Sequence, residues 1–368
     1  MAHEHQERYS ELVLERLRNE LVLSDGDIFN NDYEGDPAAG IVKIPVRDTE
    51  VQVSDYDKAN GIPPTNGSTA YVDMPITKDK AVNEIIDDYD AEAVPDDLVA
   101  DRLDSAGYSL AATVDSDGAS TLLAGATVMN VAALSSANIY STVVSIRTAM
   151  SKAKIPNDGR RYLLCTPDII ALFLTCPEFV RSTALGDQTV EKGFVGKIAG
   201  FKVKEYNDET ANLAMIAGHP RFATRVKAWK KPVKIQDLSG SGKYIGASAV
   251  QGRFIYDHKV LRSVAIRAVY SPGSLTASLA AATGASSTGK TIVTVTAGNT
   301  GTTYAYKLNP TKRATFGETS SDYNGTSLTS GTTKIEVSAG DVIEVVNLSD
   351  SAVVAVTYLT VAAADIGV

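Results

Sequence analysis

A continuous helical pattern from Pro95 to Ala124 limits most strongly which folds this chain can adopt. Pro95 suits the first position of a helix, and the two aspartates after it favour the positive end of the helix dipole. Apolar residues then recur at helical spacing, at Val99, Leu103, Ala106, Leu110 and Val114. A helix over this range is about 45 Å long. Because Gly107 and Gly118 weaken it in isolation, packing against other elements must stabilise it.

The segment before this helix predicts a long β-hairpin. Apolar and polar residues partly alternate in residues 41–53 and again in residues 72–76, as they do in strands. Between them lies DYDKANGIPPTNGSTAY, residues 55–71, whose glycines, prolines and asparagines favour a long tip over a tight turn. We therefore expect two antiparallel strands whose connecting loop projects from the body.

The first 40 residues predict an extended arm. Residues 7–23 have an amphipathic helical pattern, and a stretch rich in Gly, Asn and Asp follows with too few apolar residues to fold alone. The apolar side of the helix holds Val13, Leu14, Leu17 and Leu21. Such an arm needs a neighbouring surface to cover it, so it predicts self-association.

Beyond the long helix, helices and strands mix without a regular βαβ repeat, which indicates an α+β fold. Ser135 and Ser136 are candidate caps for a helix over residues 137–153, and Thr166 is the candidate cap of a helix that begins at Pro167. Strands are predicted at residues 162–165, 197–205, 213–217, 233–236, 253–256 and 263–270. Residues 93–272 therefore form the main body.

A second domain follows the Ser, Pro and Gly residues at positions 271–274, which mark a boundary. After it the composition shifts to Thr, Ser, Ala and Gly, and strand patterns of period two recur. They lie at residues 291–296, 303–308, 333–337, 341–346 and 353–359. Short strands without a helical pattern predict a small all-β sandwich of immunoglobulin-like type over residues 273–368.

Composition and charge exclude several classes of function. Hydrophobic residues make up 44% and charged residues 21% of the chain, as in folded soluble proteins. A net charge of -9 argues against sequence-specific reading of nucleic acid, but it leaves open a shell that encloses DNA. We expect no membrane span, because the apolar stretch 352–364 is shorter than the ~18 residues required, and the N-terminus has no pattern of a secretory signal.

No motif predicts catalysis, a cofactor or a metal site. The four histidines are scattered, and the acidic run from Asp87 to Asp97 lacks the glycine and the closing glutamate of a calcium loop. Cys165 and Cys176 are predicted to be buried thiols. The stretch GASSTGKT, residues 284–291, has the spacing of a phosphate-binding loop, but a strand pattern follows where a helix is needed.

Several segments together resemble the major capsid proteins of tailed bacteriophages with the HK97-like fold. The arm is followed by NDYEG, by the hairpin with DYDKANG, and by the acidic IIDDYDAEAV that leads to the long helix. RRYLLCTPDIIALFLTCPEFV precedes GKIAGFKVKEYND, and GRFIYDHKVLRSVAIRAVY is similar to the closing strands of such subunits. The resemblance covers about residues 1–272, so the β domain is an addition to it.

The resemblance implies an N-terminal arm in residues 1–40, an extended loop in 41–92, and the spine helix, peripheral domain and axial domain in 93–272. It implies a structural protein rather than an enzyme, one that forms hexamers and pentamers around double-stranded DNA in a virion. A scaffolding protein and a portal would be partners during assembly in the host cytoplasm. Tyr56 and Lys58 of the loop would join the apolar arm residues at subunit contacts. The β domain would be displayed outward.

Three other functions stay open. An encapsulin-like compartment shell shares the fold but encloses protein cargo, and the added β domain and the DYDKANG segment favour the phage protein instead. A secreted adhesion protein would use the β domain but requires a signal sequence. The NTPase alternative is supported only by the GASSTGKT stretch.

Replacing Lys290 by alanine is expected to leave assembly unchanged, because the glycine-rich stretch before it lacks the helix that would orient amides toward a phosphate. Sedimentation of the assembled protein checks this. Measurable ATP binding by the C-terminal domain would contradict the expectation.

Overall fold

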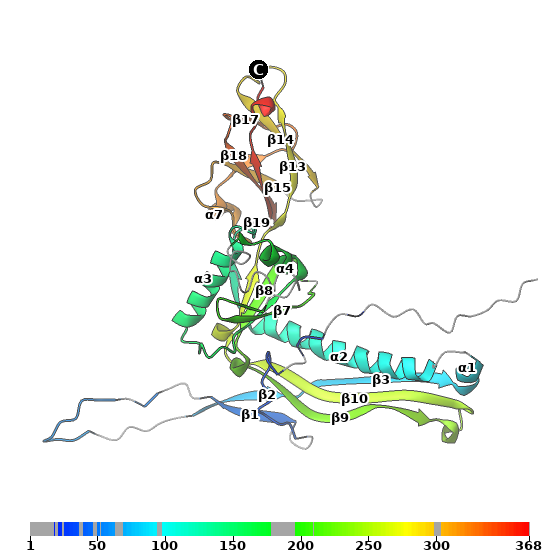
Figure 1. The fold of residues 1–368 in the computed structure, drawn as a ribbon. Helices are drawn as coiled ribbons and strands as arrows, with labels where there is room; N and C mark the ends of the chain where they lie inside the picture. The colour runs from blue at the N-terminus through cyan, green and yellow to red at the C-terminus, as the bar shows by residue number, and fades with distance from the viewer. Residues whose placement is uncertain are drawn as a thin grey trace, which may run out of the picture. The chain divides into compact units, whose positions relative to one another are not determined.

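A computed structural model of the chain describes residues 18, 21–23, 26–36, 40–46, 50–51, 53–62, 69–93, 98–177, 196–208, 210–297 and 303–367. The chain divides into two units (Figure 1). Unit 1 contains Met1–Gly125 and His219–Ser263, and unit 2 contains Ala126–Gly218 and Val264–Val368. Each unit is thus built from two separate stretches of sequence.

Unit 1 is built on the long helix α2, Leu98–Gly125, and on an antiparallel sheet in the order β3-β10-β9 (Figure 1). The strands are β3 Lys78–Asp87, β9 Ala223–Asp237 and β10 Ala247–Val260. Leu110 of α2 is buried against Phe254 and Tyr256 of β10. The predicted long helix is confirmed from Leu98 onward, and residues 94–97 lie outside the described residues.

The prediction of short strands at residues 233–236 and 253–256 is wrong in length, because β9 spans 15 residues and β10 spans 14. β9 lies at the edge of the sheet and is mostly exposed, so no apolar alternation marks it in the sequence. β3 was not predicted, and its charged residues belong to a strand that ends at Asp87. A short helix, α1 Asp88–Ala93, follows directly.

The predicted hairpin is confirmed, with β1 Ile41–Val46 antiparallel to β2 Ala70–Pro75. Its strands are shorter than expected, since residues 50–51 and 53–57 belong to no strand. The base of the hairpin is anchored in unit 1, where Ile44 and Met74 are fully buried beside Val226. The loop therefore projects from a fixed base (Figure 1).

The N-terminal arm differs from its prediction. Arg18 and residues 21–23 are not helical, and most of the predicted helix lies outside the described residues. Ile28 and Phe29 are fully buried within unit 1, and Asn30 forms a bridge with Thr224. The expectation that this stretch needs a neighbour is therefore wrong for residues 28–30, because its few apolar side chains find a site in their own subunit.

Gly118 of α2 makes room for the arm. A Cβ atom at this position would lie 3.1 Å from a ring carbon of Phe29. Phe29 also packs on His258, with 4.8 Å between the ring centroids. The glycine that weakens α2 in isolation thus allows a close contact in the folded unit.

A partly buried polar network joins α2 to β10 and β3. The Tyr256 hydroxyl donates to the Asp117 carboxylate at 2.7 Å, and the Lys78 ammonium lies 3.1 Å from the same group. Burial alone would raise the pKa of Asp117, but Tyr256 and Lys78 hold it below its ordinary value. Burial, together with the charges of Arg225 and Lys78, lowers the pKa of His258 to about 4.

Unit 2 begins with a mixed sheet in the order β4-β11-β8-β5-β7-β6, with two helices beside it. The strands are β4 Thr127–Asn130, β5 Tyr162–Cys165, β6 Lys197–Ile198, β7 Phe201–Glu205, β8 Leu213–Gly218 and β11 Arg267–Tyr270. The helices are α3 Ile139–Lys152 and α4 Pro167–Leu174. Every residue of β5 is buried, as its apolar sequence predicts. The predicted mixture of helices and strands is confirmed.

Three local predictions for this sheet need correction. The strand expected at 197–205 is a hairpin, since Ala199 and Gly200 have φ of 47° and 88° and turn the chain. The strand expected at 263–270 begins only at Arg267, after a turn of 3-10 helix. Asn138, not Ser135 or Ser136, precedes α3, and its side chain accepts the Ser135 N–H at 2.8 Å.

Residues 273–367 form two facing sheets, in the orders β12-β19-β18-β15-β16 and β13-β14-β17. The strands are β12 Gly273–Ser274, β13 Thr276–Ala281, β14 Lys290–Ala297, β15 Thr303–Leu308, β16 Thr326–Leu328, β17 Lys334–Glu336, β18 Val342–Ser349 and β19 Ala352–Thr360. Val293 and Ile335 from one sheet share a core with Ile343 and Val345 from the other. The five predicted strands are confirmed, and β12, β13 and β16 were missed because they are short or rich in Ala and Ser.

The other face of the five-stranded sheet is also covered. Tyr323 of the short helix α7, Ser320–Tyr323, packs there beside Val346 and Leu348 of β18. Lys290 is the first residue of β14, so a strand and not a helix follows the glycine-rich stretch. The prediction against a phosphate-binding loop is confirmed in this respect.

The two-sheet domain contacts the mixed sheet within unit 2. The Phe316 N–H donates to the carbonyl of Val131 at 3.2 Å, and the Phe316 ring stacks on Tyr270 with centroids 5.7 Å apart. β12 pairs in parallel with β19 directly after the mixed sheet ends. The connection between the two parts is therefore itself hydrogen-bonded structure.

Unit 1 is expected to lose stability in acid through His258. Its imidazole binds a proton near pH 6.5 in the unfolded chain but only near pH 4 when folded. Stability is complete above pH 6.5 and falls by about 2 to 3 kcal/mol as the pH drops toward 4. Urea unfolding of the wild type and of His258→Gln at neutral and acid pH checks this, with a smaller pH dependence expected in the variant. Equal pH dependence in both would contradict it.

Candidate self-association surfaces

The tip of the hairpin loop is a turn organised by Asp57. Its carboxylate accepts the Ala59 N–H at 2.8 Å and the Asn60 side-chain amide at 2.6 Å, and its carbonyl accepts the Gly61 N–H. The hydrogen bonds from the Ala59 N–H and the Asn60 side chain lower the pKa of Asp57. Gly61 has a φ of 66°, a conformation that favours glycine. Local hydrogen bonds therefore give the tip a defined shape.

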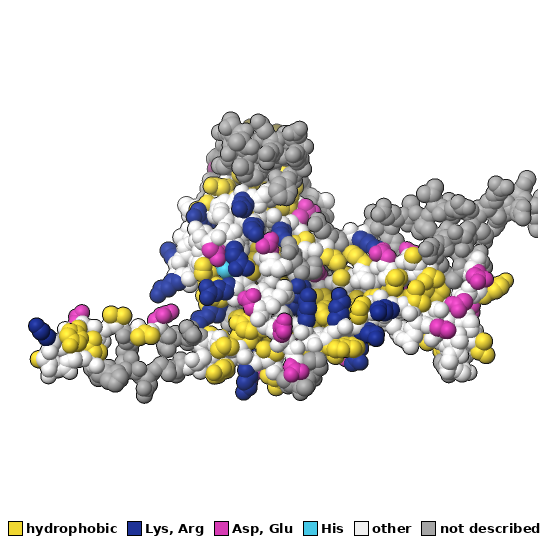
Figure 2. Space-filling model, turned by 60° about the horizontal axis from the view of Figure 1, so that its bottom comes forward, with side chains coloured by type: hydrophobic (Ala, Val, Ile, Leu, Met, Phe, Trp, Pro, Cys, Tyr) yellow, Lys and Arg dark blue, Asp and Glu magenta, His cyan; other side chains and the backbone are white. Residues whose placement is uncertain are grey.

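Hydrophobic side chains along this loop are left in solvent. We call Val51, Val53, Tyr56 and Ile62 the loop strip; their exposed fractions are 86%, 96%, 73% and 44%. Hydrophobic side chains are visible along the projecting loop at the left of Figure 2. Single exposed apolar residues are common, but a run of them on an extended loop is typical of a surface that a partner covers.

The structure brings together only part of the site expected from the sequence. Tyr56 and Lys58 are both exposed at the loop tip, next to the Asp57 turn. Leu21 is half-buried, and the Leu23 N–H that follows it donates to the buried carboxylate of Asp115 at 3.0 Å. Val13, Leu14 and Leu17 lie outside the described residues. Val51 and Val53 were not predicted as contact residues, because their alternating pattern is typical of a strand.

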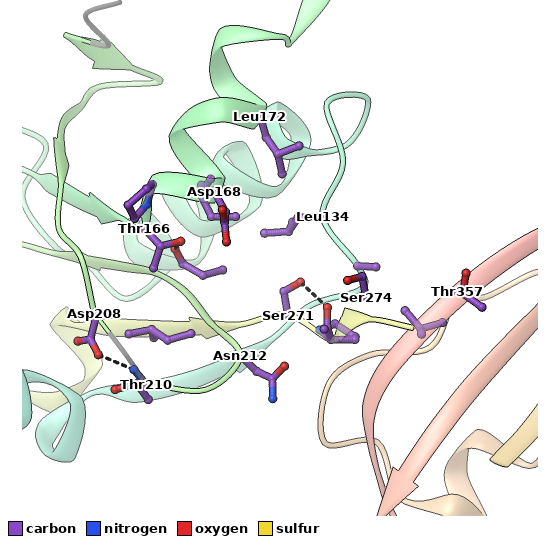
Figure 3. A pocket seen from close by; sticks show the side chains of 18 of the residues that line it. Leu134, Thr166, Asp168, Leu172, Asp208, Thr210, Asn212, Ser271, Ser274 and Thr357 are labelled. Carbon is purple, nitrogen blue, oxygen red and sulfur yellow. Dashed lines mark hydrogen bonds between the residues drawn. The ribbon is translucent and has the colours of Figure 1, made fainter. Parts of the chain in front are cut away.

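Unit 2 contains an open groove of about 770 Å³. It lies between the start of α4, the segment 207–214, and the first residues of the two-sheet domain (Figure 3). Asp208 accepts the Thr210 N–H, and the Ser271 hydroxyl donates to the Pro272 carbonyl. Among the described residues that line it there is no histidine, cysteine, lysine or arginine. Its ionisable side chains include the two carboxylates Asp168 and Asp208.

Cys165 and Cys176 are both free and buried, as predicted, and burial raises the pKa of the Cys165 thiol. In the described ranges no three His, Cys, Asp or Glu side chains are grouped as a metal site requires. No helix of the described segments is long and apolar enough to cross a membrane.

Comparison with solved structures identifies the fold. A chain of Mycobacterium phage Che8 is 21% identical with a TM-score of 0.61, over 72% of this chain and 96% of that one. The capsid of cyanophage P-SCSP1u gives 14% identity and a TM-score of 0.62, over 73% and 93% of the two chains. The mature capsid of bacteriophage PhiM1 gives 13% identity and a TM-score of 0.60, over 73% of this chain and 92% of that one. The predicted α+β capsid fold is confirmed.

The family comparison covers the spine of this fold. A family model described as phage capsid protein matches residues 75–266, a little more than half of the chain. The match runs from the last residue of β2 to the residue before β11 and ends before the two-sheet domain. No curated protein matches the sequence. The chain therefore belongs to the phage capsid protein family, as a major capsid protein of a tailed bacteriophage with the HK97-like fold.

Proposed function

We propose that copies of this chain form hexamers and pentamers that close into an icosahedral head around double-stranded DNA. As a member of the capsid family, the protein has a structural role, self-assembles into shells and belongs to the virion. The exposed loop strip is the observation that supports contact between copies most directly. The base of the same hairpin is buried, so the loop is held out from the subunit at a fixed root.

The strip suits contact with another copy for energetic reasons. Covering a valine or tyrosine side chain contributes about 1.5 to 3 kcal/mol. The free energy of one such contact is small compared with the entropic cost of association. A closed ring, however, repeats the contact at every subunit. Tyr56, Lys58 and the apolar arm residues Val13, Leu14, Leu17 and Leu21 are our proposed contact residues.

We assign residues 1–40 to the arm, 41–92 to the extended loop with its flanking strands, 93–272 to the spine helix, peripheral domain and axial domain, and 273–368 to an accessory domain. A scaffolding protein and a portal are the proposed partners during assembly in the host cytoplasm, and we propose no membrane contact. In keeping with the structural family, we propose that the chain is not an enzyme and uses no cofactor. An encapsulin-like shell is less well supported, because the family match is to phage capsid proteins.

We propose that the accessory domain is immunoglobulin-like and lies on the outer surface of the head. Its sheet order supports the first part: β14 neighbours β17, while β15, β18 and β19 lie side by side in the other sheet. These pairings correspond to the B–E and C–F–G pairings of immunoglobulin domains. The position of the domain beyond the family match supports its role as an addition to the shell.

Placing a charge on the loop strip is expected to weaken assembly. Val53→Asp should raise the subunit concentration needed for assembly about tenfold or more, because a buried carboxylate replaces an apolar contact. The subunit itself should stay folded, since Val53 is 96% exposed. Sedimentation and electron microscopy measure assembly, and circular dichroism checks the fold.

Ser54→Asp is the matched control, because it adds the same charge to the neighbouring exposed residue. It should assemble nearly as the wild type does. If both variants assemble equally well, the strip is not a subunit contact. If the wild type itself remains a dispersed monomer at high concentration, the proposed shell is wrong.

A further inference from the structure

The edge strand β9 carries an unusual density of positive charge. Within eight residues it has four exposed lysines, which we call the basic strip: Lys227, Lys230, Lys231 and Lys234. None of the four ammonium groups has an ion pair with a carboxylate of the described residues. No aspartate or glutamate occurs between Ala223 and Gln236. The chain as a whole is acidic, so this charge is local.

The strip extends over both faces of the sheet edge. On the face toward α2, Lys227 and Lys230 lie in register with Tyr256 and Phe254 of β10. These in turn pair with Lys78 and Lys80 of β3. Asp117 lies 3.1 Å from the Lys78 ammonium and 3.8 Å from that of Lys80, so one carboxylate serves both. This face therefore has an excess of positive charge.

The opposite face continues the same pattern. Lys231 lies opposite Arg253 of β10, and Lys234 lies opposite Gln251. The Arg253 guanidinium is already bound to Asp79, and it lies 5.9 Å from the centre of the Trp229 ring. Trp229 is 41% exposed. Lysines on this face thus stand beside an exposed aromatic ring and have no acid of their own.

Neighbouring positive charges disfavour the folded strand. Burial and the charges of Arg225 and Lys230 lower the pKa of Lys227, which means that its surroundings disfavour the charged form. Lysines on an edge strand also prevent pairing with strands of other molecules. Preventing such pairing explains one or two of the lysines. Pro232, which has no N–H to donate, already hinders pairing along this edge. Four lysines that have no ion pair with a carboxylate of the described residues indicate an anionic partner from outside the subunit.

We propose that the basic strip binds the phosphate backbone of the packaged double-stranded DNA and forms part of the inner wall of the shell. The inference rests on the proposed function, since it requires that the shell encloses DNA. Eight strand residues extend about 25 Å, and duplex DNA has one negative charge per about 1.7 Å of its axis. Several phosphates are therefore within reach of the four flexible side chains.

The chemistry of the strip favours a backbone contact over base reading. Lysine is a point charge on a flexible stem and accepts many phosphate geometries, whereas arginine presents a planar fork. Contacts to phosphates position a nucleic acid without reading its sequence. A shell of acidic subunits repels DNA on average, so a local basic strip supplies the attraction that the net charge does not.

The test compares two triple variants of the full chain. Lys230, Lys231 and Lys234 are replaced by glutamine in one, and the exposed lysines Lys152, Lys154 and Lys243 in the other. Both lose three positive charges. Binding to a duplex of about 30 base pairs is measured against salt concentration, where each phosphate contact adds about 0.9 to the slope of log K against log salt. We expect the magnitude of this slope to be smaller by about 2 to 3 in the strip variant than in the wild type, and by less than 1 in the control variant.

Each alternative result has a separate meaning. Equal losses in both variants, or no loss in either, would overturn the inference. Unchanged DNA binding with failed assembly of the strip variant would also overturn it, since the strip would then contact acidic protein surface. If the wild-type chain forms DNA-filled heads but the strip variant binds DNA normally, only this inference fails. If the wild type forms no shell, the proposed function fails instead.

Discussion

Unit 1 depends on one face of α2 being buried against β10. Leu110 and Val114 cover Phe254 and Tyr256, and Ala106 covers Val250 further along the strand. A helix with two internal glycines is weak alone, and an isolated three-stranded sheet would leave its apolar face exposed to water, so each stabilises the other. The hydrogen bond from Tyr256 to Asp117 fixes the position of the helix along the strand. Segments far apart in the sequence thereby become one body.

That body determines what the hairpin can do. Ile44 and Met74 bury their side chains at its base, so the two strands are anchored to the rest of unit 1. Among the described loop residues after Val46 no strand pairing continues, and Val51, Val53 and Tyr56 are exposed. The local turn at Asp57 keeps the tip ordered. One segment thus combines a buried root with an exposed apolar surface, the surface that we propose another copy covers.

The sequence predicted those elements whose pattern reflects their own burial. Residues 162–165 are all apolar and form a central strand, and the helical spacing of Ile139, Val143, Ile146 and Met150 corresponds to the buried face of α3. β9 could not be found in this way, because an exposed edge strand rich in lysine has no apolar alternation. The arm was misjudged for a different reason. Two apolar residues suffice there, because Gly118 and His258 supply a site that only the fold assembles.

The candidate contact residues were predictable only in part. Tyr56 and Lys58 were found from the resemblance of the loop segment, and their exposure agrees with a contact role. Val51 and Val53 look like strand residues, and only the register of β1 with β2 reveals that their pairing has already ended. The excess of lysine over carboxylate around β9 likewise becomes visible only when the register of β3, β10 and β9 is known, and not from any single segment.

The hydrogen-bonded junction in unit 2 has a consequence for display. Because Phe316 is tied to Val131 and stacks on Tyr270, and β12 joins the sheet at once, the C-terminal sandwich has little freedom to swing on its connection. In a symmetric lattice every copy would then present the same side at the same angle and at a fixed repeat distance. A receptor with several binding modules could engage many copies simultaneously, so that weak individual affinities would combine into tight attachment.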